Sequence, residues 1–216
     1  MTKHHVLMLW SGGLDSTYLL QKNLEKGNQV TAVYVKLENN DQWKAETAAI
    51  EKIYKILYHD FPDQLRLIKG DHYFVSNICE GGLMLQQVPG HIMYLLHHLK
   101  SYIDEVQVGY VCGDHAVSFV EDFRKIWRAY AGLFPGDKIQ KLTFPLIKTT
   151  KEEVWDCLNP KLEPLISFCD HPNRVRGNTF SACGVCESCV RMREMTGMYP
   201  PINDMFFKNL KDGKKD

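Results

Sequence analysis

One six-residue stretch, Ser11–Ser16, constrains this chain more than any other, because it reads Ser-Gly-Gly-Leu-Asp-Ser between two segments of different periodicity. Residues 6–10, just before it, form a continuous apolar run typical of a buried strand. Residues 17–24, just after it, repeat apolar side chains at helical spacing. Strand, glycine-rich turn and helix predict an anion site, since glycines let the backbone approach a phosphate and a helix start offers free N–H groups.

The loop differs from two commoner nucleotide-binding signatures. No Lys-Ser/Thr pair follows the glycines, as the usual NTPase loop requires, and the G-x-G-x-x-G pattern of dinucleotide-binding folds is absent. The alternative interpretation is an ordinary strand–helix turn that contains two glycines. Position, flanking periodicity and residue types together favour a phosphate site, in which the hydroxyls of Ser11, Ser16 and Thr17 are further donors.

Beyond the loop, apolar runs alternate with helical segments. Four further strands are predicted, at 30–35, 65–68, 106–111 and 139–144. Helices are predicted at 43–61, at 119–131 and from a capping box at Thr150 onward. This order is typical of an α/β fold, a Rossmann-like five-stranded parallel sheet with helices on both faces. Ligands of such sheets bind at the carboxyl ends of the strands, so residues 34–38 and 69–72 are expected beside the loop.

For several residues near these strand ends, the sequence allows two interpretations. Tyr34 is either a packed core aromatic or part of the ligand site. Lys148 and Lys151 lie where a helix start meets the sheet edge, and spacing alone leaves open whether they contact phosphate or solvent. Residues 71–89 are expected to form a loop or short helix that covers the site. The histidines of 90–103 are interpreted as surface or satisfied side chains in preference to metal ligands.

Composition limits the class of protein. Lys plus Arg and Asp plus Glu both number 26, so no net basic field favours a nucleic-acid partner. Hydrophobic residues make up 44% of the chain, which predicts a globular protein. No apolar run reaches the roughly 18 residues of a membrane span, and no secretory leader is recognised. We therefore expect a cytoplasmic protein without a membrane partner, where a reducing environment favours metal binding or free thiols over disulfides.

Four of the seven cysteines cluster late in the chain. Cys183, Cys186 and Cys189 form C-x2-C-x2-C, and Cys169 precedes them. Two-residue gaps let thiolates converge on one ion, as a tetrahedral zinc site requires. An iron–sulfur cluster also takes four thiolates, but the C-x3-C-P continuation of one ferredoxin signature is missing. The spacing therefore favours structural zinc over an iron–sulfur cluster or a set of free thiols.

Three motifs together suggest a family. The S-G-G-x-D-S loop stands at Ser11–Ser16, P-L-x-x-x-T-K-x-E at Pro145–Glu153, and a terminal cysteine pattern at Cys169 with Cys183–Arg191. With them the chain resembles the 7-cyano-7-deazaguanine synthase family of the PP-loop ATP pyrophosphatases, and weaker similarity extends over most of residues 5–197. The resemblance implies a fold of the adenine nucleotide alpha hydrolase type. Residues 1–160 would form the nucleotide-binding domain, 161–200 a zinc-binding region packed on it, and 201–216 a tail.

The resemblance also implies an activity, that of an ATP-dependent carbon–nitrogen ligase. Such an enzyme adenylates 7-carboxy-7-deazaguanine, lets ammonia displace AMP to give the amide, and uses a second ATP to form 7-cyano-7-deazaguanine for queuosine-type nucleosides. Magnesium at the leaving pyrophosphate and a homodimer are implied as well. Its predicted catalytic residues are Ser11, Asp15, Ser16 and Lys148. Its predicted ATP-binding residues are Trp10, Ser11, Gly12, Gly13, Leu14, Asp15, Ser16, Thr17, Tyr18, Leu19, Leu20 and Tyr34. Structural zinc would be held by Cys169, Cys183, Cys186 and Cys189.

One element of the family is altered here. Its S-G-Y-P-D-C-R stretch, which shapes the substrate pocket, has its nearest counterpart at Ser118–Arg124, where only the serine, aspartate and arginine are kept. This leaves open a related enzyme that stops at the amide, uses another amine, or acts on a different carboxylate or on tRNA. A thiolating enzyme would need a reactive cysteine near the loop, for which Cys79 and Cys112 are candidates. A non-catalytic module that senses ATP or a deazapurine is the remaining alternative.

Overall fold

The computed structural model describes residues 3–37, 42–73, 95, 98–133, 139–177 and 179–197. Its helices and strands in the first two thirds of the chain are β1 (His5–Leu9), α1 (Leu14–Glu25), β2 (Gln29–Leu37), α2 (Gln42–Asp60), β3 (Leu65–Tyr73), β4 (Glu105–Gln107), η1 (His115–Phe119), α4 (Val120–Ala131) and β5 (Lys141–Thr143). They are followed by α5 (Lys151–Asp156), η2 (Glu163–Leu165), β6 (Asn173–Arg176), β7 (Thr179–Ser181) and α6 (Glu187–Thr196). Among these described residues no helix is both long and apolar enough to cross a membrane.

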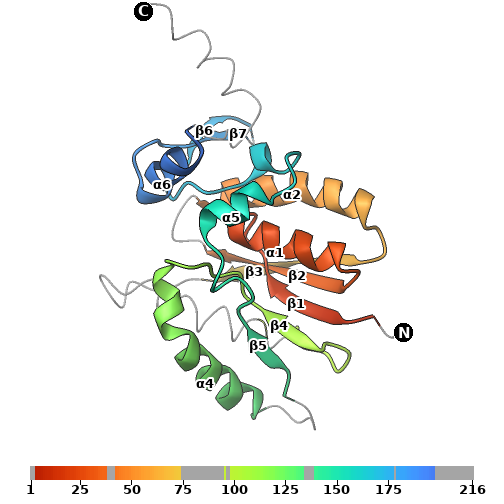
Figure 1. The fold of residues 1–216 in the computed structure, drawn as a ribbon. Coiled ribbons are helices and arrows are strands. Elements are labelled where there is room, and N and C mark those ends of the chain that lie inside the picture. The colour runs from red at the N-terminus through yellow and green to blue at the C-terminus, as the bar shows by residue number, and fades with distance from the viewer. Residues whose placement is uncertain are drawn as a thin grey trace, which may run out of the picture.

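The central sheet has five strands in the order β3-β2-β1-β4-β5, and all neighbouring pairs are parallel (Figure 1). This confirms the fold class predicted from the sequence. From β1 the chain steps outward to β3 and then returns to the other side of β1, where β4 pairs with it. The strand order therefore reverses between β1 and β4, which is the position where open parallel sheets bind their ligands.

Both faces of the sheet are covered by helices (Figure 1). On one face, Val6 and Met8 of β1 pack in a core that includes side chains of α1, α2 and α5. On the other face, Leu7 packs in a second core with α4, whose Phe123 and Trp127 are buried. Because the middle of β1 is buried on both faces, residues 6–9 are continuously apolar instead of alternating.

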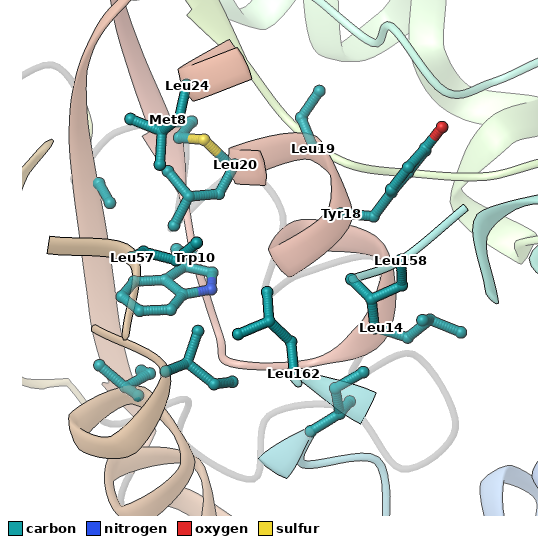
Figure 2. Packing of buried hydrophobic residues seen from close by; sticks show 14 of the residues in the cluster. Met8, Trp10, Leu14, Tyr18, Leu19, Leu20, Leu24, Leu57, Leu158 and Leu162 are labelled. Carbon is teal, nitrogen blue, oxygen red and sulfur yellow. The ribbon is translucent and has the colours of Figure 1, made fainter. Parts of the chain in front are cut away.

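The first core fixes both ends of the Ser11–Ser16 loop. Figure 2 shows Met8 and Trp10 on the strand side of this core and Leu20 on the α1 side. Leu158 and Leu162, from the segment after α5, lie near Leu14 at the start of α1 in the same view. Burial of each such leucine stabilises the folded state by about 1.5–3 kcal/mol. The loop therefore connects β1 and α1, which are both packed in this core.

The C-terminal region has a much smaller core. Strands β6 and β7 form an antiparallel pair of their own, and every residue of β6 is exposed. Phe180 and two of the cysteines, Cys169 and Cys189, are buried there against Ala45 and Ala48 of α2, while Met192 of α6 packs in the first core. Figure 1 shows this region beyond α2 and α5, on the side toward which the strands point.

Several predicted boundaries differ from the structure. The strands predicted at 106–111 and 139–144 pair only over 105–107 and 141–143, and the helix predicted at 119–131 is preceded by η1. The β4 ladder ends at Gln107, two residues before Gly109 packs against the start of α1, where a Cβ would lie 3.3 Å from the carbonyl oxygen of Asp15. The capping box at Thr150 is present as predicted. The predicted covering loop beyond Tyr73 and most of the histidine-containing segment lie outside the described residues.

Candidate functional site

A cleft of about 860 Å³ opens at the carboxyl ends of β1, β2 and β4. Its walls come from the Ser11–Ser16 loop, from α2, from residues 108–119 and from the C-terminal residues 167–195. The cleft therefore lies at the reversal of strand order, and β2 and Lys151 of α5 contribute to its lining as well.

The loop itself is organised by hydrogen bonds between its own polar groups. The Oγ atoms of Ser11 and Ser16 lie 3.2 Å apart, and the Gly13 N–H donates to Ser11 Oγ at 3.3 Å. Gly13 is also the N-cap of α1 and provides no side-chain cap. The N–H groups in the first turn of a helix lack intrahelical partners, and the positive end of the helix dipole lies there. This end of α1 is thus suited to an anion such as phosphate.

Gly12 has a conformation that few other residues adopt. Its φ of +74° lies in the left-handed region. A Cβ at this position would lie 3.0 Å from Ile50 Cγ1 and 3.3 Å from the carbonyl oxygen of Glu46, both in α2. The loop therefore needs a glycine for its backbone geometry and for its close approach to α2.

A chain of charged side chains runs along the cleft. Lys151, at the start of α5, places Nζ 2.9 Å from Asp15 Oδ2 and 3.4 Å from Asp114 Oδ1. Arg191 of α6 places Nη1 4.0 Å from the same Asp114 oxygen. All four residues line the cleft. The anion site at α1 is thus connected by ion pairs to α5 and to the C-terminal region.

Burial and ion pairing shift the pKa values of these charged side chains in opposite directions. Burial raises the pKa of Asp15, and the Lys151 ammonium opposes that rise. Burial lowers the pKa of Lys151, but the charges of Asp15 and Asp114 outweigh it, so this pKa lies above its usual value and the lysine is charged at neutral pH. The second carboxylate oxygen of Asp15, Oδ1, is buried without a hydrogen-bond partner among the described residues. Such an atom is suited to a cation or a donor from a ligand.

Tyr34 fits both of its interpretations, because it is buried in the first core and also lines the cleft. Its hydroxyl donates to Glu46 Oε2 at 2.9 Å. Burial raises the pKa of Glu46 to about 7, although the Tyr34 hydroxyl acts to lower it. The α2 wall of the cleft therefore carries a carboxyl group that titrates near neutral pH.

The predicted ATP-binding residues separate into two groups, and Gly12 belongs to the group that does not line the cleft. Those that line the cleft are Trp10, Ser11, Gly13, Leu14, Asp15, Ser16 and Tyr34. Thr17, Tyr18, Leu19 and Leu20 are buried on α1, and the Thr17 hydroxyl already accepts the Trp10 indole N–H at 3.0 Å. Lys148 is exposed and does not line the cleft, whereas Lys151 does. The catalytic role of Lys148 stays a prediction that the structure does not connect to the loop.

The four clustered cysteines converge on one point. Their Sγ atoms all lie within 4.8 Å of one another, with Cys169 and Cys186 4.0 Å apart and Cys183 and Cys189 3.9 Å apart. A tetrahedral zinc ion with bonds of about 2.3 Å sets its sulfurs about 3.8 Å apart. In a four-iron cluster each thiolate binds a different iron, which separates the sulfurs further. The spacing fits a single metal ion.

Backbone N–H groups support these thiols. The N–H of Cys183 donates to Cys169 Sγ at 3.2 Å, and the N–H of Cys186 donates to Cys183 Sγ at 3.4 Å. The N–H of Val185 is the largest influence that lowers the pKa of Cys183, to about 6, while burial raises that of Cys169 to about 11. A metal ion that takes thiolates must therefore displace protons, and its affinity rises with pH.

Residues next to the cysteine cluster form part of the cleft wall. Asp170 directly follows one ligand and Ser188 directly precedes another, and the Ser188 hydroxyl donates to Asp170 Oδ1 at 3.1 Å. Both line the cleft together with Arg191. The gathering of the four cysteines thus positions three polar side chains of the site.

The altered stretch Ser118–Arg124 lies largely outside the cleft. Asp122 pairs with Lys125 at 2.9 Å and Arg124 pairs with Glu121, both on the surface of α4. From this stretch only Phe119 lines the cleft. Of the two candidate cysteines, Cys112 is exposed and absent from the cleft lining, and Cys79 lies outside the described residues.

Comparisons with known proteins show remote structural similarity only. No known protein-family profile matches the chain, and no curated protein matches it. A U34-tRNA thiolase, NcsA from Methanococcus maripaludis, solved with a 4Fe–4S cluster, aligns at 15% identity and a TM-score of 0.43, over 72% of this chain and 56% of its own. An NMN synthetase from Francisella tularensis aligns at 19% identity and a TM-score of 0.40, over 70% and 58%.

A third solved structure covers more of both chains. It is a predicted subunit of a tRNA methyltransferase from Methanocaldococcus jannaschii, aligned at 11% identity and a TM-score of 0.38 over 91% of this chain and 90% of its own. The present chain spans little more than half the length of the first two proteins. Similarities this low assign neither a family nor an activity to the chain.

Proposed function

We propose that this protein activates a carboxylate with ATP and releases pyrophosphate. The observation that carries the proposal is the Ser-Gly-Gly-Leu-Asp-Ser loop at the start of α1, with the Lys151 ammonium 2.9 Å from Asp15 in the same cleft. A helix N-terminus and a cation together favour a polyphosphate. The motif's resemblance to PP-loop pyrophosphatases supports cleavage between the α and β phosphates.

The loop residues have separate roles in this proposal. The first-turn N–H groups of α1 and the hydroxyls of Ser11 and Ser16 would bind phosphate oxygens, while Lys151 offsets their charge. The partnerless Oδ1 of Asp15 fits a magnesium ligand. Magnesium would neutralise the leaving pyrophosphate. The reaction depends on charge stabilisation and requires no protein nucleophile.

For the acid we propose 7-carboxy-7-deazaguanine, and for the amine ammonia. The carboxylate oxygen attacks the α-phosphorus of ATP and pyrophosphate leaves. Ammonia then attacks the acyl carbon and loses a proton as AMP departs, which gives the amide. The amide oxygen attacks a second ATP with loss of pyrophosphate, and loss of AMP and of the remaining amide protons forms the nitrile. The cysteine cluster, in this proposal, holds a structural zinc ion.

A related adenylating enzyme is the second candidate. Asp122 and Arg124, two of the three residues kept from the family's substrate element, are paired with neighbours on the surface of α4. This pairing favours a substrate contact set that differs from the family's. An enzyme that stops at the amide, takes another amine, or uses a different carboxylate or tRNA would share the ATP half of the reaction.

The experiment is a reaction with defined products. The purified protein is incubated with ATP, magnesium, ammonium and 7-carboxy-7-deazaguanine, and AMP, pyrophosphate and the product mass are measured. The proposal expects AMP and a nitrile, whereas the amide alone supports the second candidate. Absence of AMP with this acid contradicts the proposed substrate. An Asp15→Ala variant that keeps both ATP binding and its biological effect would identify a non-catalytic sensor.

A further inference from the structure

Ser167 lies against the phosphate loop although it is about 150 residues away in sequence. It belongs to a four-residue segment, Ile166–Cys169, that joins η2 to the first cysteine of the cluster. The Ser167 N–H donates to the Gly12 carbonyl at 2.9 Å. A Cβ on Gly13 would lie 3.2 Å from the Ser167 carbonyl oxygen. The segment therefore crosses the loop in direct backbone contact with both glycines.

The Ser167 side chain has no evident structural role. The residue is only 5% exposed and lines the cleft. Its Oγ is buried without a hydrogen-bond partner among the described residues, as is Asp15 Oδ1 across the loop. A buried hydroxyl without a partner destabilises a fold, because it gives up its hydrogen bonds to water without replacing them. Such a hydroxyl, beside an anion site, is suited to donate a hydrogen bond to an acceptor atom of a bound ligand.

We propose that Ser167 contacts the nucleotide, and that its hydroxyl donates a hydrogen bond to a phosphate oxygen of the triphosphate held by the loop. This inference rests on the ATP site proposed above. The two partnerless atoms are complementary, because the Asp15 carboxylate accepts and is suited to a cation, whereas the Ser167 hydroxyl can donate to an anion. Phosphate is the anion for which the adjoining start of α1 is suited.

Buried residues before and after Ser167 in the chain fix the position of its hydroxyl. Ile166 is fully buried in the first core, and Cys169 is fully buried in the cysteine cluster. Between them the backbone is tied to Gly12. Ser167 is therefore a contact between the metal-holding region and the phosphate loop, and its placement depends on the folding of the cluster.

The test compares Ser167→Ala with the wild type in two measurements that need no turnover. The first is the thermal midpoint without nucleotide, and the second is the Kd for α,β-methylene-ATP with magnesium. Removing a partnerless buried hydroxyl is expected to leave the midpoint unchanged or higher. Losing a hydrogen bond to a charged phosphate is expected to weaken the Kd by about 10-fold or more.

Two further variants make the comparison specific. Ser181→Ala removes a hydroxyl from β7, outside the cleft lining, and is expected to bind the analogue as the wild type does. Ser167→Thr keeps the hydroxyl and is expected to retain most of the affinity, which separates loss of the donor from a general disturbance of the segment.

Three results overturn the inference. If Ser167→Ala binds the analogue as tightly as the wild type, the hydroxyl does not contact the nucleotide, while ATP use by the wild type still stands. A lower midpoint with unchanged affinity has the same consequence and assigns the hydroxyl a structural partner. If the wild type itself fails to bind the analogue, the proposed ATP site and this inference both fail.

Discussion

The Ser11–Ser16 loop and the region of the cysteine cluster line the same cleft, but they are stabilised in different ways. The loop joins β1 to α1, two elements buried in a large apolar core that also includes α2 and α5. The cluster region has a small core, an exposed hairpin and four thiols gathered within 4.8 Å. One side of the site is therefore held by apolar burial, whereas the other has little apolar core and four thiols placed to hold an ion.

Because of this difference, the donors at the start of α1 and the opposite wall of the cleft are positioned by different interactions. The loop's donors are largely backbone groups at a helix start, which the sheet positions without any ligand. The opposite wall includes Asp170, Ser188 and Arg191, which lie within two residues of a cysteine in sequence, and it requires the cysteines to be gathered. The chain of ion pairs through Lys151 and Asp114 connects the two sides.

The most severe test of this difference between the two sides is to remove one of the four thiols. Cys186→Ser is expected to lose the bound metal and to lower the thermal midpoint by many degrees, since structural zinc sites contribute about 10 kcal/mol or more in small domains. Metal content and a melting curve followed by circular dichroism measure this. Cys157→Ser removes an exposed cysteine outside the cluster and is the control.

The same variant tests whether the two sides are coupled. Nucleotide affinity is expected to fall in Cys186→Ser because Ser167 and Arg191 lose their support, while the far-ultraviolet signal of the sheet is largely kept. A Cys186→Ser protein with full metal content and the midpoint of the wild type would show that the cluster does not hold an ion.

The next largest effect concerns the loop. Asp15→Asn is expected to lower the rate of AMP formation by about 100-fold or more, because it removes the charge that pairs with Lys151 and the proposed magnesium ligand. Steady-state kinetics with varied ATP measure kcat and KM separately. Asp122→Asn makes the same change in an exposed pair on α4 and is expected to keep the activity of the wild type. Equal rates in the two variants would contradict a role for Asp15 in catalysis.

A smaller effect is expected from the carboxyl group on the α2 wall. The pKa of Glu46 rises from 4.5 to about 7 on folding, mainly because of burial. Between these two values the folded state binds more protons than the unfolded state, so stability falls as pH rises through that window and levels off above it. A shift of this size is on the order of 3 kcal/mol.

Glu46→Gln removes that titration, so its free energy of unfolding should lose this pH-dependent decline between pH 4.5 and 7. Urea unfolding at several pH values measures it. Glu51→Gln, on the same helix in an exposed pair with Lys69, should keep the profile of the wild type. A wild-type profile in Glu46→Gln would show that this carboxyl has an ordinary pKa.

The sequence predicted those parts of the molecule whose signals are local. Buried parallel strands read as apolar runs, and the loop and three of the cysteine ligands are nearly contiguous, so all were identified without the structure. The end of β4 was not, since the ladder ends at Gln107, two residues before Gly109 packs against the start of α1. Such an end depends on tertiary contact and not on propensity.

The remaining site residues come from distant segments. Asp114, Ser167 and Arg191 reach the cleft only through the crossovers of the sheet and the folding of the cluster, and no spacing along the chain connects them. Lys148 and Lys151 differ in a subtler way. They flank the N-cap Thr150, and only the direction of α5 brings Lys151 and not Lys148 to Asp15.

The smallest expected effect tests how closely the loop depends on its neighbour α2. Gly12 and Gly27 both have a left-handed φ, +74° and +79°, but a Cβ would contact α2 only at Gly12 and would meet open space at Gly27. Gly27→Ala is expected to lose about 1–2 kcal/mol of stability from the backbone alone. Gly12→Ala should lose about 1–3 kcal/mol more from overpacking and should also weaken ATP binding. Urea denaturation and nucleotide titration of both variants measure the difference. Equal losses would mean that the loop tolerates the contact, and that packing against α2 does not fix the phosphate site.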